Sequence, residues 1–260
     1  MNPASPSCDR FFEALAKLDL PLISHAGEER AVHGGNTQHF GNPLLLRRAL
    51  DHGVRVVVAH CGAMGQDRDL DKGENGPYVD SSDLFARLMD DPVYGPKLSG
   101  DISAMTQLNR AGPALETVLA REDWHPRLHN GSDYPLPGVM PLFSVAYMAQ
   151  LGLIPPSAVP VLGEIRRHNP LLFDFVLKRH LSFKGKRFAP SVFMTRSCFV
   201  KKEKKRICST GFGCTPPSRL PRRTVRRTLR ALRAMPRPPP RARSAWSSPG
   251  PPRRWRPARC

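Results

Sequence analysis

The feature that most constrains the fold is an alternation of short apolar strands with helices. Four segments rich in Val, Leu and Ile, or bounded by turn residues, are predicted as strands: 20–25, 54–60, 97–102 and 127–133. Helices are predicted over 11–18, 43–52, 81–90, 113–121, 142–150, 157–167 and 171–180. Strands that alternate with helices form parallel β/α units, so we expect an α/β fold with four such units. A closed (β/α)8 barrel needs eight.

Chemically useful side chains stand where three of these strands end. His25 ends the first strand, His60 the second and Asp133 the fourth. Loops at the carboxyl ends of parallel strands carry the chemistry of such folds, and side-chain alternation along each strand places His60 and Asp133 on an inward face. We therefore expect His25, His60 and Asp133 to meet, although they are far apart in the chain. Two imidazoles and a carboxylate suit Zn²⁺, and Mn²⁺ or Fe²⁺ would also fit.

Each of these residues also has a structural interpretation. A single histidine at a strand end is more often a hydrogen-bonded structural residue than a ligand, and Asp133 could merely cap a turn. His33 and His39 lie in a Gly-rich loop that we expect to be solvated, although contact with substrate is the alternative.

Three other features are expected to be structural. His129 lies deeper along its strand than Asp133, which favours packing, and Cys61 is expected to be a small buried residue that points away from His60. Asp67, Asp69 and Asp71 lack the glutamate of a calcium loop, so we expect a solvated loop there.

Four motifs make the sequence similar to a known family. They are PLISHAG at 21–27, VVAHCG at 57–62, GSDYP at 131–135 and HNPLLF at 168–173. Over residues 10–181, with 196 as the alternative end, the chain resembles the amidohydrolase-related (type 2) TIM-barrel metal-dependent hydrolases, a family that includes metal-dependent decarboxylases. The resemblance implies that His25 binds metal and that His60 binds a second metal or polarises the substrate. It implies that Asp133 binds metal and acts as general base.

One motif of that family is missing. Its first strand ends in His-x-His, which occurs nowhere in this chain. The resemblance places His25 on the fifth strand, so we expect a TIM-barrel fold truncated to about its last four β/α units. The implied function is hydrolysis of a C–N or C–O bond in a small carbonyl substrate by metal-activated water. Decarboxylation at the same site and an inactive fragment remain the alternatives.

The charge of the chain is divided unevenly. Residues 1–181 hold 17 Lys and Arg against 21 Asp and Glu, whereas residues 182–260 hold 23 against Glu203 alone. We expect 182–260 to be a disordered, Pro/Arg-rich tail, which resembles out-of-frame translation of GC-rich DNA. Non-specific association with nucleic acid through this tail is the alternative. No secretory signal or membrane-length apolar run is seen, so a cytoplasmic location is expected. The oligomeric state stays open.

Overall fold

The computed structural model describes residues 1–29 and 35–199. The chain divides into two compact units, Met1–Lys204 and Lys205–Cys260, and the description below concerns the first. His33 and the predicted tail from residue 200 onward lie outside the described residues. None of the described helices is long and apolar enough to cross a membrane.

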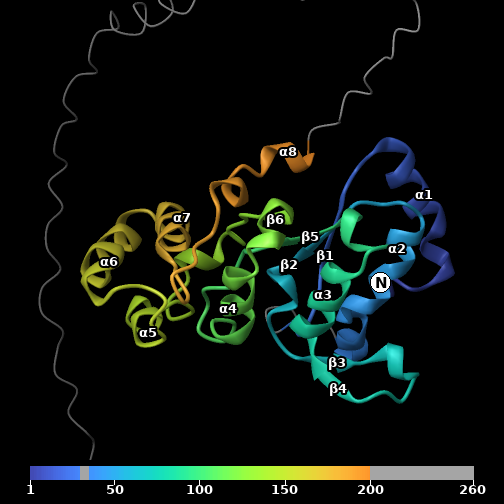
Figure 1. Ribbon diagram of the computed structural model, residues 1–260, viewed down its shortest axis with the longest axis horizontal. Coiled ribbons are helices and arrows are strands. Elements are labelled where there is room, and N and C mark those ends of the chain that lie inside the picture. The colour runs from blue at the N-terminus through green and yellow to red at the C-terminus, as the bar shows by residue number, and fades with distance from the viewer. Residues whose placement is uncertain (30–34, 200–260) are drawn as a thin grey trace, which may run out of the picture. The chain divides into compact units, whose positions relative to one another are not determined.

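A four-stranded parallel sheet forms the centre of the first unit (Figure 1). Its strands are β1 (Leu22–His25), β2 (Val56–Ala59), β5 (Leu98–Asp101) and β6 (Leu128–His129), and they lie in the order β1-β2-β5-β6. All three neighbouring pairs are parallel. The prediction of an α/β fold with four parallel strands is confirmed, although each strand is shorter than the sequence suggested.

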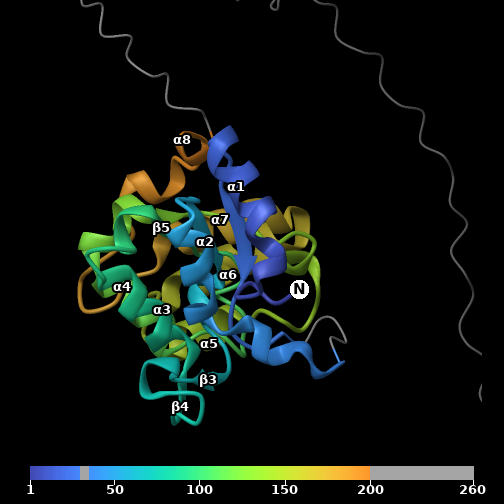
Figure 2. The same ribbon diagram turned by 90° about the vertical axis from the view of Figure 1, so that its right-hand side faces the viewer.

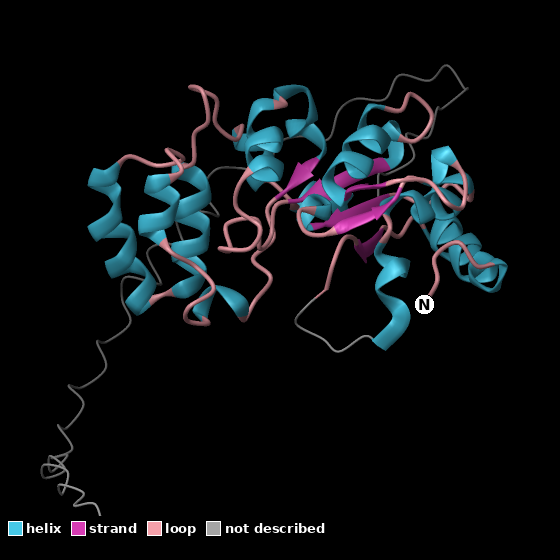
Figure 3. Ribbon diagram, turned by 90° about the horizontal axis from the view of Figure 1, so that it is seen from below, coloured by secondary structure: helices cyan, strands magenta, loops and turns pink. Residues whose placement is uncertain are grey.

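Some helices pack against the sheet, and a further group lies beside one end of it (Figure 1 and Figure 3). They are α1 (Asp9–Leu18), α2 (Arg47–Asp51), α3 (Ser81–Asp90), α4 (Pro113–Ala120), α5 (Val145–Gln150), α6 (Val159–His168), α7 (Pro170–His180) and α8 (Arg196–Phe199). The first seven correspond to predicted helices. The segment predicted as 43–52 divides into a 3-10 turn, Pro43–Leu46, and α2; Asn42 caps the turn by accepting a hydrogen bond from Leu44 N.

The core lies between the sheet and these helices. Val56 and Val58 of β2 are at most 1 % exposed and pack with Phe85 of α3 and Trp124 in one cluster of buried side chains. Phe85 and Trp124 meet edge to face at 6.0 Å between ring centroids. The β-branched run of β2 is buried along its whole length because it is a central strand, covered on both sides.

The segment of Asp67, Asp69 and Asp71, expected to be a solvated loop, is partly a hairpin, and the expectation is wrong for Asp67 and Asp69. β3 (Gln66–Arg68) and β4 (Tyr78–Asp80) pair antiparallel. Asp67 and Asp69 are buried rather than solvated. Ser81 Oγ donates to Asp67 at 2.8 Å, and Arg87 pairs with Asp69 at 2.6 Å. The partners lie on α3, which is why loop composition alone gave the wrong answer.

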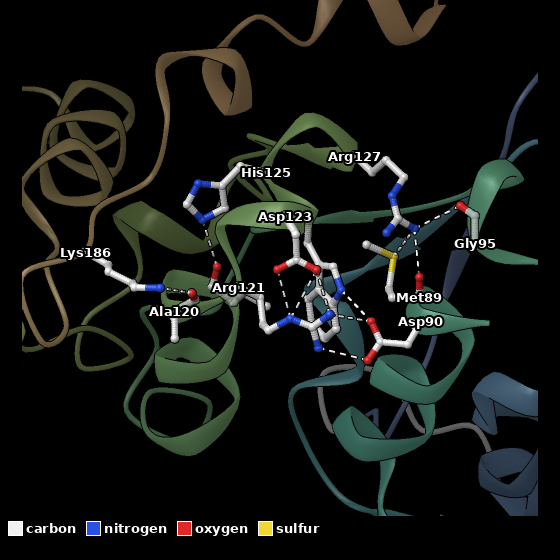
Figure 4. A network of polar contacts seen from close by, with 11 residues as sticks. Met89, Asp90, Gly95, Ala120, Arg121, Asp123, His125, Arg127 and Lys186 are labelled. Atoms are coloured by element: carbon white, nitrogen blue, oxygen red, sulfur yellow. Dashed lines mark hydrogen bonds and ion pairs between the residues drawn. The ribbon is translucent and has the colours of Figure 1, made fainter. Parts of the chain in front are cut away.

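A polar network joins the carboxyl ends of α3 and α4 to the turn before β6 (Figure 4). Arg121 forms ion pairs with Asp90 and Asp123, and Trp124 Nε1 donates to Asp90 at 2.9 Å. Arg127 donates to the carbonyls of Met89 and Gly95 at 3.1 and 2.9 Å, and so supplies a partner for the Met89 carbonyl in the last turn of α3. The network fixes where β6 begins beside β5.

The compact body continues past residue 181. Phe188 and Val192 are buried, and Val192 O accepts a hydrogen bond from Asn130 N at 2.8 Å. Arg55 links Asp19, which ends α1, to the carbonyl of Cys198 in α8, and Figure 2 shows α8 near α1. Residues 182–199, which the sequence analysis assigned to a disordered tail, are thus packed against the body, beyond the alternative end at 196.

Candidate active site

The carboxyl ends of the parallel strands bring the predicted residues together in pairs. His25 is the last residue of β1, His60 follows β2, and Asp133 lies four residues beyond β6. The His25 and His60 rings meet edge to face at 5.4 Å between centroids. His60 Nε2 lies 3.9 Å from Asp133 Oδ2. His60 therefore lies beside both of the other predicted residues.

The reason for this proximity differs from the predicted one. Both His60 (φ 57°) and Asp133 (φ 53°) have left-handed backbone conformations outside the strands, so strand alternation does not orient them. Residues 130–133 leave the ladder because Asn130 N bonds to Val192 O rather than to a neighbouring strand. Left-handed conformations of non-glycine residues are uncommon and concentrate at functional sites.

Ser103 fixes the orientation of the His60 ring. His60 is 7 % exposed, and its Nδ1 lies 3.0 Å from the Ser103 carbonyl and 2.8 Å from the Ser103 hydroxyl. If Nδ1 donates to the carbonyl, Nε2 keeps a lone pair. If the hydroxyl donates to Nδ1, Nε2 carries the proton and faces the Asp133 carboxylate favourably. Ser103 therefore supports either a ligand or a proton-donor role for His60.

His25 presents an unsatisfied nitrogen. Its Nδ1 lies 3.6 Å from a Glu29 carboxylate oxygen, whereas Nε2 is buried and has no hydrogen-bond partner. Burial lowers the pKa of His25, and Glu29 opposes this effect only in part, which favours the neutral ring. With the proton on Nδ1 toward Glu29, Nε2 is a free acceptor, the state in which histidine binds metal.

The three residues do not form a complete metal shell. Across residues 1–29 and 35–199, no group of three or more His, Cys, Asp or Glu side chains is arranged to hold a metal ion. His25 with His60 and His60 with Asp133 are close as pairs. The assignment of His25, His60 and Asp133 as metal ligands stays a prediction.

α7 anchors the segment that carries Asp133. Lys178 Nζ donates to Asp174 Oδ2 and to the Gly131 carbonyl, both at 2.7 Å, and both charged side chains are almost fully buried. Burial raises the pKa of Asp174, and Lys178 acts in the opposite direction. Because Gly131 lies two residues before Asp133, this pair holds the backbone that positions the carboxylate.

Sequence reasoning missed these supporting residues. Asp101 ends β5 as His25 ends β1, and its carboxylate accepts a hydrogen bond from Ser103 N at 2.5 Å. The position of Asp101 at the end of a predicted strand was the sequence signal that could have identified Asp101 and Ser103 as supporting residues. The spacing of Asp174 and Lys178 on one helix was the signal for the buried pair.

A cavity of about 450 Å³ opens beside His60 and Asp133. Its polar lining includes Glu29, Gln107 and Arg110, and its apolar wall includes Met64, Leu136 and Leu142. A volume of this size suits a small molecule. A larger cavity of about 940 Å³ is lined by other residues, His39 among them, and contains none of the three predicted site residues.

The other described residues considered from the sequence do not line this cavity. His39 is exposed, and its ring lies tilted against the Phe40 ring at 4.1 Å between centroids. His129 is half-buried, and burial lowers its pKa. Cys61 is 1 % exposed and donates to the Asp101 carbonyl at 3.2 Å, and burial raises the pKa of its thiol, as expected for a structural residue.

The family model described as amidohydrolase matches residues 2–157, which is more than half of the chain. The chain therefore belongs to the amidohydrolase family, as the sequence motifs indicated.

One solved structure is similar to the chain. It is a Pseudomonas putida protein assigned as a 2-pyrone-4,6-dicarboxylic acid hydrolase, with 16 % identity and a TM-score of 0.34. The match covers 71 % of this chain and 56 % of that one, so the chain spans little more than half the length of that structure. No curated protein matches the chain significantly.

Replacing Gly27 tests how tightly the turn after His25 is built. Gly27 has φ +85°, and a Cβ there would lie 2.4 Å from the Met64 carbonyl oxygen. Gly152 has a similar φ of +71° but open space around it. We expect Gly152→Ala to cost about 1–2 kcal/mol for the left-handed backbone. Gly27→Ala should cost at least about 1 kcal/mol more because the backbone oxygen cannot yield. Urea unfolding measures both, and equal losses would contradict this packing.

Proposed function

We propose that this chain is a metal-dependent hydrolase that acts on a C–N or C–O bond of a small carbonyl substrate. The observation that carries the proposal is the buried, unpartnered Nε2 of His25 next to His60. Buried polar atoms normally have partners, so such an atom in a cavity-side cluster suits a ligand that is bound in the working protein. Membership of the amidohydrolase family supports the same reaction class.

The donor chemistry suits a divalent ion. His25 and Asp133 would hold it, and it would supply an activated water when bound, as Zn²⁺ does at neutral pH. Mn²⁺ or Fe²⁺ would also be compatible with imidazole and carboxylate donors. Glu29 next to His25 Nδ1 has the place of the carboxylate that commonly orients a metal-binding histidine.

Two different side chains then carry out the two proton transfers of the reaction. Asp133 is about one-third exposed and borders the cavity, so its carboxylate can accept a proton from the attacking water. His60, with the Ser103 hydroxyl donating to Nδ1, can donate from Nε2 to the carbonyl oxygen as negative charge develops there. Lys178 keeps the Gly131 backbone, and with it Asp133, in place.

We also propose that the parallel sheet belongs to a (β/α)8-type barrel. Its strands follow one another in sequence order, β1-β2-β5-β6, as barrel strands do. A doubly wound sheet would reverse its strand order within the sheet. Sequential order therefore supports the barrel-type arrangement.

Product analysis of the full chain tests the reaction class. The metal-supplemented protein should be screened with small amides, esters and lactones in H2¹⁸O, alongside unsaturated and aromatic carboxylic acids. We expect ¹⁸O in the product carboxylate, no release of carbon dioxide, and loss of turnover after chelation. Carbon dioxide release without ¹⁸O incorporation would contradict hydrolysis and assign the decarboxylase alternative. Turnover that survives complete chelation would contradict metal dependence.

A further inference from the structure

The cavity beside His60 contains a buried cation that has no acceptor for part of its guanidinium. Arg110 is 7 % exposed, and its Nε and Nη1 are buried without a hydrogen-bond partner. Within residues 1–29 and 35–199, no carboxylate lies within ion-pair distance of it. An arginine stays charged in proteins, so leaving its donors unpaired away from water is costly. Such a cost at a cavity wall points to a bound ligand that accepts these hydrogen bonds.

A second donor lies beside the first. Gln107 is 4 % exposed, lines the same cavity, and its Nε2 is also buried without a partner. Both unsatisfied groups are N–H donors from one segment after β5, so the complementary ligand is an oxygen acceptor. A guanidinium favours a negatively charged acceptor with planar oxygens.

The charges around the cavity limit that acceptor to a single negative charge. Burial lowers the pKa of Arg110, and the carboxylates of Glu29, Asp133 and Glu28 act in the opposite direction. Glu29 and Asp133 line the cavity and would repel a doubly charged phosphate. A carboxylate brings one charge rather than two, so these carboxylates repel it less than they repel a phosphate.

We propose that Arg110 and Gln107 form a subsite for the carboxylate of a small organic acid, so that the substrate carries a carboxylate besides the bond that is broken. This proposal rests on the proposed function, because it places the scissile carbonyl between that carboxylate and His60 and Asp133. The apolar wall of Met64, Leu136 and Leu142 then contacts the hydrocarbon part of the substrate.

Binding of a matched pair of probes tests the subsite without requiring turnover. Benzoate and the neutral benzamide are titrated into the full chain by calorimetry, beside Arg110→Met, Gln107→Leu and the control Arg167→Met, whose side chain is 76 % exposed. We expect wild type and Arg167→Met to bind benzoate at least about tenfold more tightly than benzamide, a difference that one charge-assisted contact supplies. Arg110→Met should remove this preference and Gln107→Leu should reduce it. Phenyl phosphate should bind more weakly than benzoate.

Thermal stability separates ligand binding from a structural role. If Arg110 is a subsite residue with unsatisfied donors, Arg110→Met should melt at the same temperature as wild type or higher, because an unpaired buried charge is removed. A melting temperature well below that of wild type, or benzoate preference that survives Arg110→Met, would overturn the proposal. If benzoate binding depends on Arg110 but the chain hydrolyses nothing, the proposed function is contradicted and the subsite stands. Hydrolysis of neutral substrates at an unchanged rate in Arg110→Met would contradict the subsite and leave the proposed function standing.

Discussion

Asp133→Asn is expected to slow turnover of any substrate that the chain hydrolyses by at least about a hundredfold, the usual contribution of a general base. The amide has the same shape but cannot accept a proton from water at neutral pH. Because Asp133 also faces His60 Nε2 at 3.9 Å, the substitution removes the negative charge that opposes this ring. The measurement is kcat and KM for wild type and variant on one substrate.

Asp83→Asn provides the matched control. Asp83 is an exposed aspartate on α3, so the same change of charge there should leave kcat within about twofold of wild type. Unfolding curves of both variants confirm that each is folded. If folded Asp133→Asn kept most of its kcat, Asp133 could not be the proton acceptor.

Lys178→Met is expected to lower the free energy of unfolding by about 3–5 kcal/mol, the range for removing one partner of a buried ion pair. Lys178 is 1 % exposed, and the variant would leave the Asp174 carboxylate buried without its cation. It would also leave the Gly131 carbonyl without its donor. Urea unfolding monitored by circular dichroism measures the loss.

The double variant Asp174→Leu with Lys178→Met distinguishes this cause from lost packing. It removes both charges, so it should be clearly more stable than Lys178→Met alone. Arg167→Met breaks an ion pair whose side chains are 76 % and 55 % exposed, and it should change stability by no more than about 1 kcal/mol. A loss below about 1 kcal/mol for Lys178→Met would mean that the pair does not hold this region.

The parallel sheet could be predicted because periodicity reports burial directly. The Val-rich run of β2 is apolar at every position, as a strand covered on both sides must be. The hairpin of β3 and β4 could not be predicted in this way. Its short strands carry Asp67 and Arg68, and Asp67 is buried only because Ser81 on α3 supplies a partner.

The sequence predicted which residues lie close together but not how the backbone brings them there. Histidines at strand ends identified His25 and His60 because parallel strands end at one edge of the sheet. The left-handed backbone at His60 and Asp133 depends on tertiary contacts such as Asn130 N to Val192 O, which join residues 62 positions apart. Arg110 was missed because a lone arginine in a loop has no periodic signal, and its isolation is visible only in three dimensions.

The most direct test of the central claim is the metal content of the purified full chain beside His25→Ala and the control Asp83→Asn. Elemental analysis after gel filtration is compared with folding measured by circular dichroism. We predict about one divalent ion per chain in wild type and Asp83→Asn, and loss of most of it in folded His25→Ala. A folded wild-type chain that takes up no metal, or metal content unchanged by His25→Ala, would contradict the claim that this cluster is a metal-dependent hydrolytic site.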